Sequence, residues 1–468
     1  MEPVQGSLIM LSSVIGKGLQ DELDILSEHI SDNDYLRILA HYDGDGTSAA
    51  IILAKALLRE GKRFHIGYIK NLGGEGFRER IEENQDIYTI VVDAGSDQAK
   101  FVPEVEKLGI LDHHFFQEGP AKALNINARN HGIDGTRGAC GATMAYIAAL
   151  NLNEKNADLF PFFLSGAIAD KQDIGGFSGL NQKLVQEYGS RYKKVRTINL
   201  EGKDMIESLA YSTDPFFDGI SGNVENSKKL LLKAGIDPNT NVFDLNEDEK
   251  QVLEKVLGIK LISQGVGTDT LKYLETDMYR FPGIDFTSKE ISSIIDGNSK
   301  LNKNGTPVQF FLGDESTRGE SISNWKKYKS VLIDYAYKAY KELYEDTHVR
   351  YFYAPESEMA GSIGGLLMLY LAPQDKPLIG FNVSDSITKV SGRGSRRLVN
   401  IGLNLSLVMR VASESVGGNG GGHDIAAGAV IPKGKESQFV HIANSIIREQ
   451  VSPGTAEERQ KPVKKAQK

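Results

Sequence analysis

The sequence predicts an α/β fold built on a mainly parallel, doubly wound sheet, and three observations support this class. Short apolar segments alternate with longer helical ones from Tyr35 to about Leu180. This alternation is typical of a parallel sheet covered by helices. A near-continuous β-branched run at 87–92 suits a strand that is buried on both faces. A second alternating region, 348–449, predicts a smaller α/β domain at the C-terminus.

The elements of the first region follow from their residue patterns. Thr47–Glu60 carries Ala, Ile and Leu at helical spacing and stops at Gly61, and Phe160–Ala169 is an apolar segment that also indicates a helix. Apolar and β-branched runs predict strands at Tyr35–Ala40, Phe64–Ile69, Ile87–Val92 and Ile110–Leu111.

The chain changes character after this region. Residues 182–346 are rich in Leu, Lys and Glu, and we expect a helical connector or inserted domain without an obvious catalytic cluster. Its amphipathic helices are predicted at Ser227–Ala234, Glu247–Ser263 and Trp325–Asp346. The C-terminal region predicts strands at Val349–Tyr353, Leu378–Val383, Ile387–Ser391 and Ile425–Ile431, helices at Met359–Leu371 and Ile401–Val411, and a glycine loop at Gly417–Gly422. We therefore expect domains at 1–181, 182–346 and 347–450, and a disordered basic tail at 451–468.

Composition limits the class of protein. A chain of 468 residues is long enough for roughly three domains. Its single cysteine, Cys140, excludes an intramolecular disulfide and Cys-rich zinc modules, and fits a reducing cytoplasm. No apolar run reaches the ~20 residues that span a bilayer, so no membrane association is expected. The net charge of −8 counts against a purely electrostatic nucleic-acid binder, although metal-binding carboxylates contribute to that sum.

Four short stretches place carboxylates and histidines where short apolar segments end. They are His41–Gly46, Val92–Gly95, Asp112–His114 and Gly166–Asp170. Ligands in doubly wound sheets bind beyond the carboxyl ends of the strands, and three of the four stretches fall at such ends. Charged groups are rarely placed against apolar segments without a partner, and a pair of divalent metals is the simplest partner for all of them.

Each stretch taken alone has a simpler interpretation. Asp43 and Asp45 fit an ordinary glycine-containing turn, and a calcium loop is excluded because no 12-residue ligand series follows. Asp93 alone would be a helix N-cap. Asp173 competes with Asp170 as the acidic residue that follows the apolar helix.

Together the four stretches supply enough ligands for two metals that share one carboxylate. Mixed histidine and carboxylate sets suit Mn²⁺, Fe²⁺ or Zn²⁺, with Mg²⁺ tolerated where oxygen ligands dominate. Of these ions we expect Mn²⁺, with Mg²⁺ as the alternative. Two such cations ~3.5–4 Å apart can bind a phosphoester and activate water at neutral pH. We therefore expect phosphoester hydrolysis.

The C-terminal region carries a second kind of pattern. Ser391–Arg397 combines glycines and hydroxyls with three arginines, and arginine is the preferred bidentate phosphate ligand. The glycines before His423 are suited to cradling phosphate through backbone amides. A basic hairpin tip and a flexible linker are the structural alternatives. Because both patterns occur in one small region, we favour phosphate binding.

These residues resemble the DHH phosphoesterase superfamily. His41, Asp43, Asp45, Asp93, Asp112-His113-His114 and Asp170 are similar to its four motifs, and Ser391-Gly392-Arg393 and Gly421-Gly422-His423 to those of its DHHA1 domain. The length and the helical middle region resemble RecJ-like single-strand exonucleases, especially the archaeal RecJ/GAN group.

The resemblance implies roles for individual residues. His41, Asp43 and Asp93 would hold one metal, and Asp45, Asp93, His113 and Asp170 the other. His114 would face the scissile phosphate, and Asp112 would orient the neighbouring histidine. Nucleic acid would run between the two domains, with its backbone held by Ser391, Gly392, Arg393, Arg396, Gly421, Gly422 and His423.

The expected function is a two-metal exonuclease acting on single-stranded DNA or RNA in replication or repair, with the GINS complex and other fork proteins as partners. A phosphodiesterase for short oligonucleotides or cyclic dinucleotides is the first alternative. A GINS-associated fork scaffold with little catalysis is the second. Strand polarity, the choice between DNA and RNA and the oligomeric state do not follow from the sequence.

Overall fold

The computed structural model describes residues 11–70, 75–96, 105–116, 122–355 and 359–451. The chain divides into two compact units, one formed by Met1–Thr197 with Thr276–Tyr328 and the other by Ile198–Glu275 with Lys329–Lys468. The expected tail falls outside the described residues from position 452 onward. Within the described part of the chain, no helix is both long and apolar enough to cross a membrane.

The first unit is built on a five-stranded sheet in the order β2-β1-β3-β4-β5, in which every neighbouring pair is parallel. The predicted parallel sheet is therefore confirmed. Its strands are β1 (Tyr35–His41), β2 (Arg63–Ile69), β3 (Tyr88–Val92), β4 (Leu108–Asp112) and β5 (Leu124–Asn127). The three central strands end next to one another, which is the arrangement that gathers their following residues at one edge.

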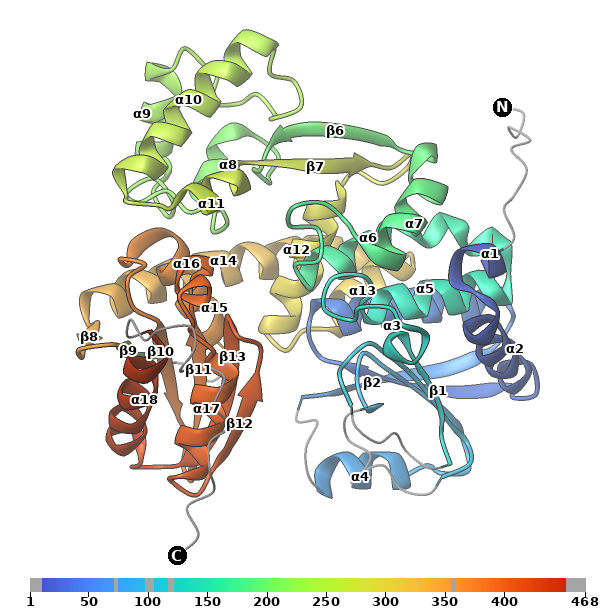
Figure 1. Ribbon diagram of the computed structural model, residues 1–468. Helices are drawn as coiled ribbons and strands as arrows, with labels where there is room; N and C mark the ends of the chain where they lie inside the picture. The colour runs from blue at the N-terminus through green and yellow to red at the C-terminus, as the bar shows by residue number, and fades with distance from the viewer. Residues whose placement is uncertain (1–10, 71–74, 97–104, 117–121, 356–358, 452–468) are drawn as a thin grey trace, which may run out of the picture. The chain divides into compact units, whose positions relative to one another are not determined.

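Alternate side chains of these strands are buried on opposite faces of the sheet. Leu39, Val91 and Ile110 pack with α4 (Glu75–Glu82). Ile38, Ile90 and the other inward residues of the second face belong to the large core that includes α3 and α5. Figure 1 shows α4 on the opposite side of the strands from α3 and α5. The helices of this unit are α1 (Leu11–Ile15), α2 (Lys17–Ser31), α3 (Gly44–Arg59), α5 (Gly141–Leu152), α6 (Phe160–Ala169), α7 (Gly179–Tyr188), α12 (Ser288–Lys300) and α13 (Gly305–Leu312).

Part of the expected helical connector belongs to the first unit. Helix α12 packs on α3 and α6, and its Ile291, Ile294 and Ile295 are buried in the same core as the sheet. The region between the two expected α/β domains also contains strands, because β6 (Lys193–Ile198) pairs with β7 (Glu275–Arg280). Its other helices are α8 (Met205–Ala210), α9 (Val224–Lys233), α10 (Glu247–Ser263), α11 (Thr268–Leu271) and α14 (Arg318–Lys341).

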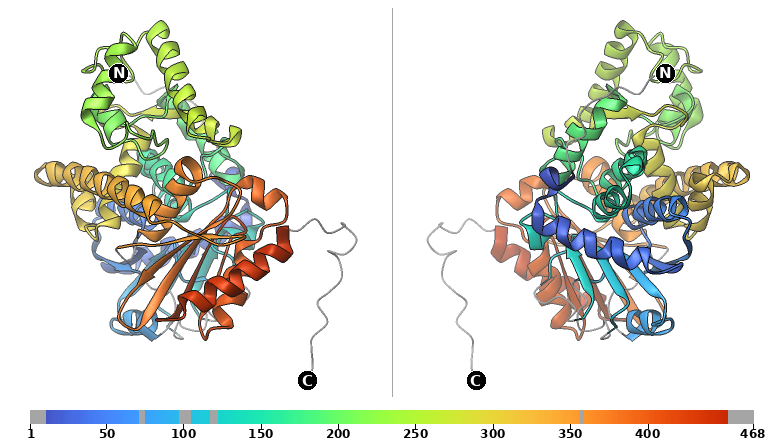
Figure 2. Two further views of the ribbon diagram at one scale, coloured as in Figure 1. Left: turned by 90° about the vertical axis from the view of Figure 1, so that its left-hand side faces the viewer. Right: turned by 90° about the vertical axis from the view of Figure 1, so that its right-hand side faces the viewer.

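The second unit contains a six-stranded sheet in the order β12-β13-β11-β10-β9-β8, in which β9 and β10 are parallel and the other pairs antiparallel. Phe381 and Phe439 help to join α18 (Glu436–Val451) and α17 (Leu405–Glu414) to one face. Figure 2 shows α18, in red, alongside the strands. The remaining elements are β8 (Tyr344–Glu345), β9 (Arg350–Tyr353), β10 (Leu378–Val383), β11 (Ile387–Arg393), β13 (Ala426–Pro432), α15 (Ala360–Leu366), a π-helical turn at Leu367–Leu371 and α16 (Arg396–Asn400).

The predicted glycine loop is wrong in part. Asn419–Gly422 forms the edge strand β12, which pairs antiparallel with β13. A Cβ added to Gly420 would lie 2.8 Å from the carbonyl oxygen of Met409. The run is therefore rich in glycine because the strand packs closely on its neighbours, and it is a paired strand where a loop was expected.

Candidate metal centre

The metal-ligand candidates meet because the strands that carry them are neighbours. His41 ends β1, Asp93 follows β3, and Asp112 ends β4, so these residues lie at one edge of the parallel sheet. The start of α3 contributes Asp43 and Asp45, and the end of α6 contributes Asp170.

One group consists of His41, Asp43 and Asp93, whose ligand atoms lie within 4.8 Å of one another. His41 Nδ1 is 3.0 Å from Asp43 Oδ2 and 3.5 Å from Asp93 Oδ2. Asp43 is the N-cap of α3 and accepts the backbone N–H of Gly46 at 3.1 Å. A Cβ on Gly46 would lie 2.3 Å from the carbonyl oxygen of His41, so this turn requires glycine.

A second group consists of Asp45, His113 and Asp170. Asp45 is 3 % exposed and accepts two backbone N–H groups from the start of α5, at 2.6 Å from Gly141 and 2.9 Å from Ala142. The N-terminus of a helix favours negative charge, so α5 fixes Asp45 as a carboxylate acceptor. Of the two acidic candidates that follow α6, Asp170 is the one whose carboxylate joins this group.

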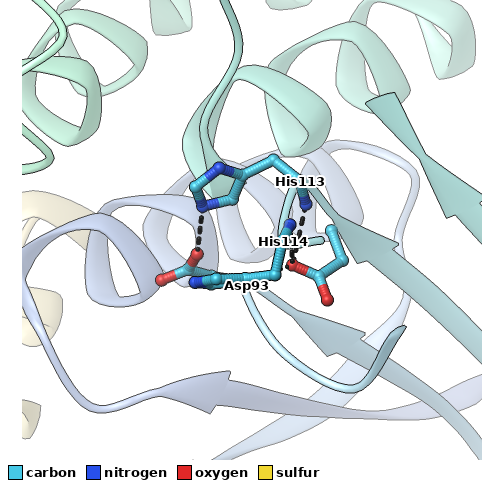
Figure 3. Close-up of side chains that lie close together, drawn as sticks. Asp93, His113 and His114 are labelled. Carbon is cyan, nitrogen blue, oxygen red and sulfur yellow. Dashed lines mark hydrogen bonds and ion pairs between the residues drawn. The ribbon is translucent and has the colours of Figure 1, made fainter. Parts of the chain in front are cut away.

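Asp93 lies between the two groups. Its Oδ1 is 3.1 Å from His113 Nε2, as drawn in Figure 3, while its Oδ2 faces His41. His113 Nδ1 lies 2.6 Å from the carbonyl oxygen of Gly135, which can only accept a hydrogen bond. The Nδ1 proton is therefore held by Gly135, and Nε2 is left as the ligand atom. The φ angle of Asp93 is +60°, a left-handed conformation that few residues adopt and that often marks a functional site.

Asp112 organises the histidines. With Asp93, His113 and His114 it also forms a third group whose candidate ligand atoms lie within 4.8 Å of one another. Its side chain is fully buried. Its Oδ1 accepts the backbone N–H of His113 at 2.7 Å and lies 2.8 Å from the ring Nδ1 of His114. Its Oδ2 accepts the backbone N–H of Ser96 at 2.9 Å. The histidine ring that Asp112 orients is thus that of His114, whose side chain is 40 % exposed at the open side of the site.

The electrostatics of the group reflect its crowded carboxylates. Asp170 is exposed as a residue, but desolvation of its carboxyl group and the charges of Asp93 and Asp43 raise its pKa to about 6. Burial and the charge of Asp93 likewise raise the pKa of Asp45 well above its ordinary value. Burial lowers the pKa of His114, but the charge and hydrogen bond of Asp112 outweigh this effect and raise the pKa to about 9. His114 is therefore a cation at neutral pH.

These residues fit a pair of divalent cations. Among the described residues, the buried Nδ1 atom of His41 has no hydrogen-bond partner of acceptable geometry, although two carboxylate oxygens face it. A buried polar atom of this kind calls for an unseen partner. A cation would satisfy His41 and would also offset the repulsion that raises the pKa of Asp45 and Asp170.

A buried polar chain that the sequence did not reveal supports Asp170. Thr143 Oγ1 donates to Asn181 Oδ1 at 2.6 Å, and Asn181 Nδ2 donates to Gln172 Oε1 at 2.6 Å. Gln172 Nε2 in turn lies 2.7 Å from Asp170 Oδ2 and 2.8 Å from the carbonyl oxygen of Ala139. In the sequence, these residues are visible only as polar positions in or after apolar helices. Their connection to Asp170 depends on the folded chain.

Two glycines allow the helices to approach the carboxylates. A Cβ on Gly141 would lie 2.4 Å from the Cβ of Asp93, and one on Gly166 would lie 2.6 Å from Asp45 Oδ1. Any side chain at either position would displace a ligand candidate. Neither glycine was singled out from the sequence as a packing position.

The C-terminal candidates form their own cluster in the second unit. Across β13, Gly392 and Gly422 both pair with Ala427, while Ser391 and Gly421 both pair with Gly428. In this register, the Ser391–Arg393 pattern on β11 and the Gly421–Gly422 pattern on β12 flank the same residues of β13. The remaining candidates, Arg393, Arg396 and His423, lie at the ends of these strands or just beyond them.

Arg393 is the most buried cation of that cluster. Its Nη1 donates to the carbonyl oxygen of Gly392 at 2.9 Å, and burial lowers its pKa. A Cβ on Gly361 would lie 2.7 Å from its Nη2, so α15 approaches the guanidinium closely. Arg393 is partly buried, and its planar guanidinium is suited to an external phosphate. The other predicted contact, Arg396, is exposed at the start of α16, and His423 is exposed after β12.

Comparisons with known proteins match this architecture. A family model described as "DHH family, N-terminal domain" matches residues 36–168, and one described as "DHHA1 domain" matches residues 347–449. The chain is 30% identical over 441 residues to the uncharacterized protein MJ0831 of Methanocaldococcus jannaschii, which covers 89% of this chain and 94% of that protein.

Three solved structures share the fold. RecJ from Thermus thermophilus in complex with Mn²⁺ has a TM-score of 0.59 at 16% identity, and the match covers 95% of this chain but 56% of RecJ. An exonuclease RecJ bound to manganese has a TM-score of 0.54 at 16% identity, with 95% and 97% covered. CDC45 from Entamoeba histolytica has a TM-score of 0.60 at 10% identity, with 92% and 98% covered.

Proposed function

Because this chain belongs to the DHH family and carries a DHHA1 domain, we propose that it is a metal-dependent exonuclease that hydrolyses single-stranded nucleic acid with two metal ions. The observation that carries the proposal is the convergence of six candidate ligands in two groups, which are linked where Asp93 Oδ1 lies 3.1 Å from His113 Nε2. Each group offers three ligand atoms and leaves one side of the site open to solvent through Asp43, Asp170 and His114.

We assign the residues as follows. His41, Asp43 and Asp93 would hold one ion, and Asp45, Asp93, His113 and Asp170 the other. When bound, the ions, with Mn²⁺ preferred and Mg²⁺ tolerated, would polarise the phosphodiester and lower the pKa of water.

The chain's own groups then position the substrate. The cationic ring of His114, held by Asp112 at 2.8 Å, would donate a hydrogen bond to a non-bridging phosphate oxygen. In the second unit, Arg393 would hold the strand's backbone together with Ser391, Gly392, Arg396, Gly421, Gly422 and His423. Arginine supports this assignment because its planar fork matches phosphate oxygens.

The test is digestion of matched single-stranded DNA and RNA oligonucleotides, each labelled at either end, in Mn²⁺ or Mg²⁺. The control is Asp45→Ala, which removes a buried ligand candidate. We expect stepwise, metal-dependent shortening that the control lacks, and the labelled end that persists reveals the polarity. Survival of long strands with cleavage of dinucleotides or cyclic dinucleotides would refute the exonuclease and favour a small-substrate phosphodiesterase.

Inactivity on all of these substrates would favour a replication-fork scaffold. We also propose a cytoplasmic role in DNA replication or repair with the GINS complex as a partner. This part of the proposal rests on the resemblance to the archaeal RecJ/GAN group. Tagged protein that fails to recover GINS subunits from its native host would contradict the partner assignment without touching the enzymatic one.

A further inference from the structure

Helix α12, which the sequence placed in a connector without a catalytic cluster, ends beside the metal centre. Asn304, just beyond α12, donates from Nδ2 to the carbonyl oxygen of Tyr42 at 2.6 Å and to Thr47 Oγ1 at 2.8 Å. These bonds fix the end of α12 to the start of α3. Asp296 of α12 also lies close to Gly44, because a Cβ there would be 3.0 Å from the Asp296 Cβ.

Two lysines meet at the ring of Tyr42, the residue between His41 and Asp43. Lys300 Nζ, from the end of α12, lies 5.6 Å from the ring centroid, and Lys70 Nζ, from the end of β2, lies 5.5 Å from it. Both distances are within the range of a cation–π contact. The same Tyr42 ring makes an edge contact with the ring of His41, with centroids 5.1 Å apart. Tyr42 therefore ties two ammonium groups to the first metal-ligand group.

Lys70 is exposed, and the side chain of Lys300 is 19 % exposed. The side chains of Asp43 and Asp296 are 32 % and 33 % exposed, and Lys300 Nζ is 3.8 Å from Asp296 Oδ1. Lys70 also hydrogen-bonds the side chain of Asn302.

Both lysines stand beside the first metal-ligand group through the ring of Tyr42. Lys300 already pairs with Asp296, and His41 is the nearer cation to Asp43. Lys70 brings a second ammonium group to the Tyr42 ring, which contacts His41 of that group. A phosphate of the substrate is the anion that a nuclease brings to this position, and lysine binds phosphate as a point charge without a fixed fork geometry.

We propose that Lys70 and Lys300 bind the phosphate that neighbours the scissile one in the substrate strand. The inference rests on the proposed function and deepens it, because it makes the site selective for chains with at least two consecutive phosphates. Contacts of this kind fix the register of a strand and carry no sequence preference. Tyr42 would hold the two ammonium groups in place.

The experiment compares two substrates in Mn²⁺. One is a single-stranded DNA oligonucleotide, and the other is bis(p-nitrophenyl) phosphate, a phosphodiester without a neighbouring phosphate. The variants are Lys300→Met, Lys70→Met and the double substitution, with Lys300→Arg as a charge-preserving variant. Lys289→Met is the matched control, because Lys289 lies in the first turn of α12 and roughly 16 Å away along the helix axis.

For the double variant, we expect KM for the oligonucleotide to rise about tenfold or more, with kcat/KM for the small diester within twofold of wild type. Lys300→Arg and Lys289→Met should leave both substrates close to wild type. Oligonucleotide binding should lose roughly 0.7 of the log–log salt slope for each lysine removed. Thermal melting of each variant identifies any loss of fold.

Three outcomes would overturn the inference. Equal losses on both substrates would place the lysines on the scissile phosphate or in support of the metals. An unchanged KM for the oligonucleotide in the double variant would remove them from the substrate. If the wild-type protein cleaves the small diester but no oligonucleotide, the proposed function itself fails, a result that the variants alone cannot produce.

Discussion

Substitutions of Asp93 separate the requirements of the metal site from those of the backbone. Asp93 has a φ of +60°, a conformation that Asn tolerates and that Ala adopts only at a cost. Its two oxygens face His41 Nδ1 at 3.5 Å and His113 Nε2 at 3.1 Å. Asp93→Asn keeps the size and backbone preference of the residue while it removes the charge. Asp93→Ala removes both.

The structure sets the expected magnitudes. Desolvation and the charge of Asp93 both raise the pKa of Asp45 and of Asp170. Removal of the Asp93 charge therefore relieves the repulsion among these three carboxylates in the metal-free protein. We therefore expect metal-free Asp93→Asn to melt at or above the wild-type temperature. Asp93→Ala should be less stable than the Asn variant by ~1–2 kcal/mol, the cost of a left-handed conformation. For a unit of this size that difference corresponds to roughly 2–8 °C.

Both variants should lose activity by more than about 100-fold. Removal of a group that merely orients a metal ligand costs ~10–100-fold, and a ligand shared by two ions should cost more. Thermal melting with and without Mn²⁺, beside oligonucleotide cleavage, measures all of these quantities. An Asn variant that keeps activity within tenfold of wild type, or the full Mn²⁺ stabilisation, would refute the shared-ligand assignment. Equal melting temperatures for the two variants would refute the backbone argument.

Three further predictions follow from the same geometry. Desolvation and the neighbouring carboxylates raise the pKa of Asp170 to about 6. The folded, metal-free protein therefore binds a proton here more tightly than the unfolded chain, and its free energy of unfolding falls as the pH rises from about 4 through 6. Mn²⁺ should therefore raise the melting temperature more at pH 7.5 than at pH 5, and equal gains would contradict this. Gly166→Ala, whose Cβ would lie 2.6 Å from Asp45 Oδ1, should cost ~1–3 kcal/mol and weaken Mn²⁺ binding in calorimetry. Gly319→Ala, in open space on α14, should instead be neutral or stabilising, and similar effects of the two would exclude a steric cause. His114→Gln should lower kcat by up to about 10²–10³-fold while Mn²⁺ affinity stays unchanged, and a loss of affinity would make His114 a ligand.

The parts of the fold that the sequence predicted well are those with strong local patterns. Helix α6 spans Phe160–Ala169 as predicted, because its apolar run is continuous. Helix α10 spans Glu247–Ser263 as predicted, because Asn246 and Glu249 form a capping box before an amphipathic pattern. The convergence of the ligand candidates also followed from a local pattern combined with one topological rule. Each stretch could be placed at the end of a parallel strand or of an apolar helix, and this placement was enough to predict that the stretches lie together.

Long-range placement was beyond the reach of the sequence. Gln172 and Asn181 resemble ordinary polar residues after a helix, and only the folded chain connects them to Asp170. Lys300 stands in a charged segment with many similar lysines, and its position beside Tyr42 depends on how α12 packs. The glycines of β12 favour a loop by intrinsic preference, but pairing with β13 overrides that preference.

The central claim is that the four separated motifs form one centre for two ions that share Asp93. Anomalous diffraction from crystals grown with Mn²⁺ tests it most directly. We predict two manganese peaks about 3.5–4 Å apart, one beside His41 and Asp43 and the other beside Asp45 and His113, with Asp93 between them. A single peak, or two peaks that do not share Asp93, would contradict the claim.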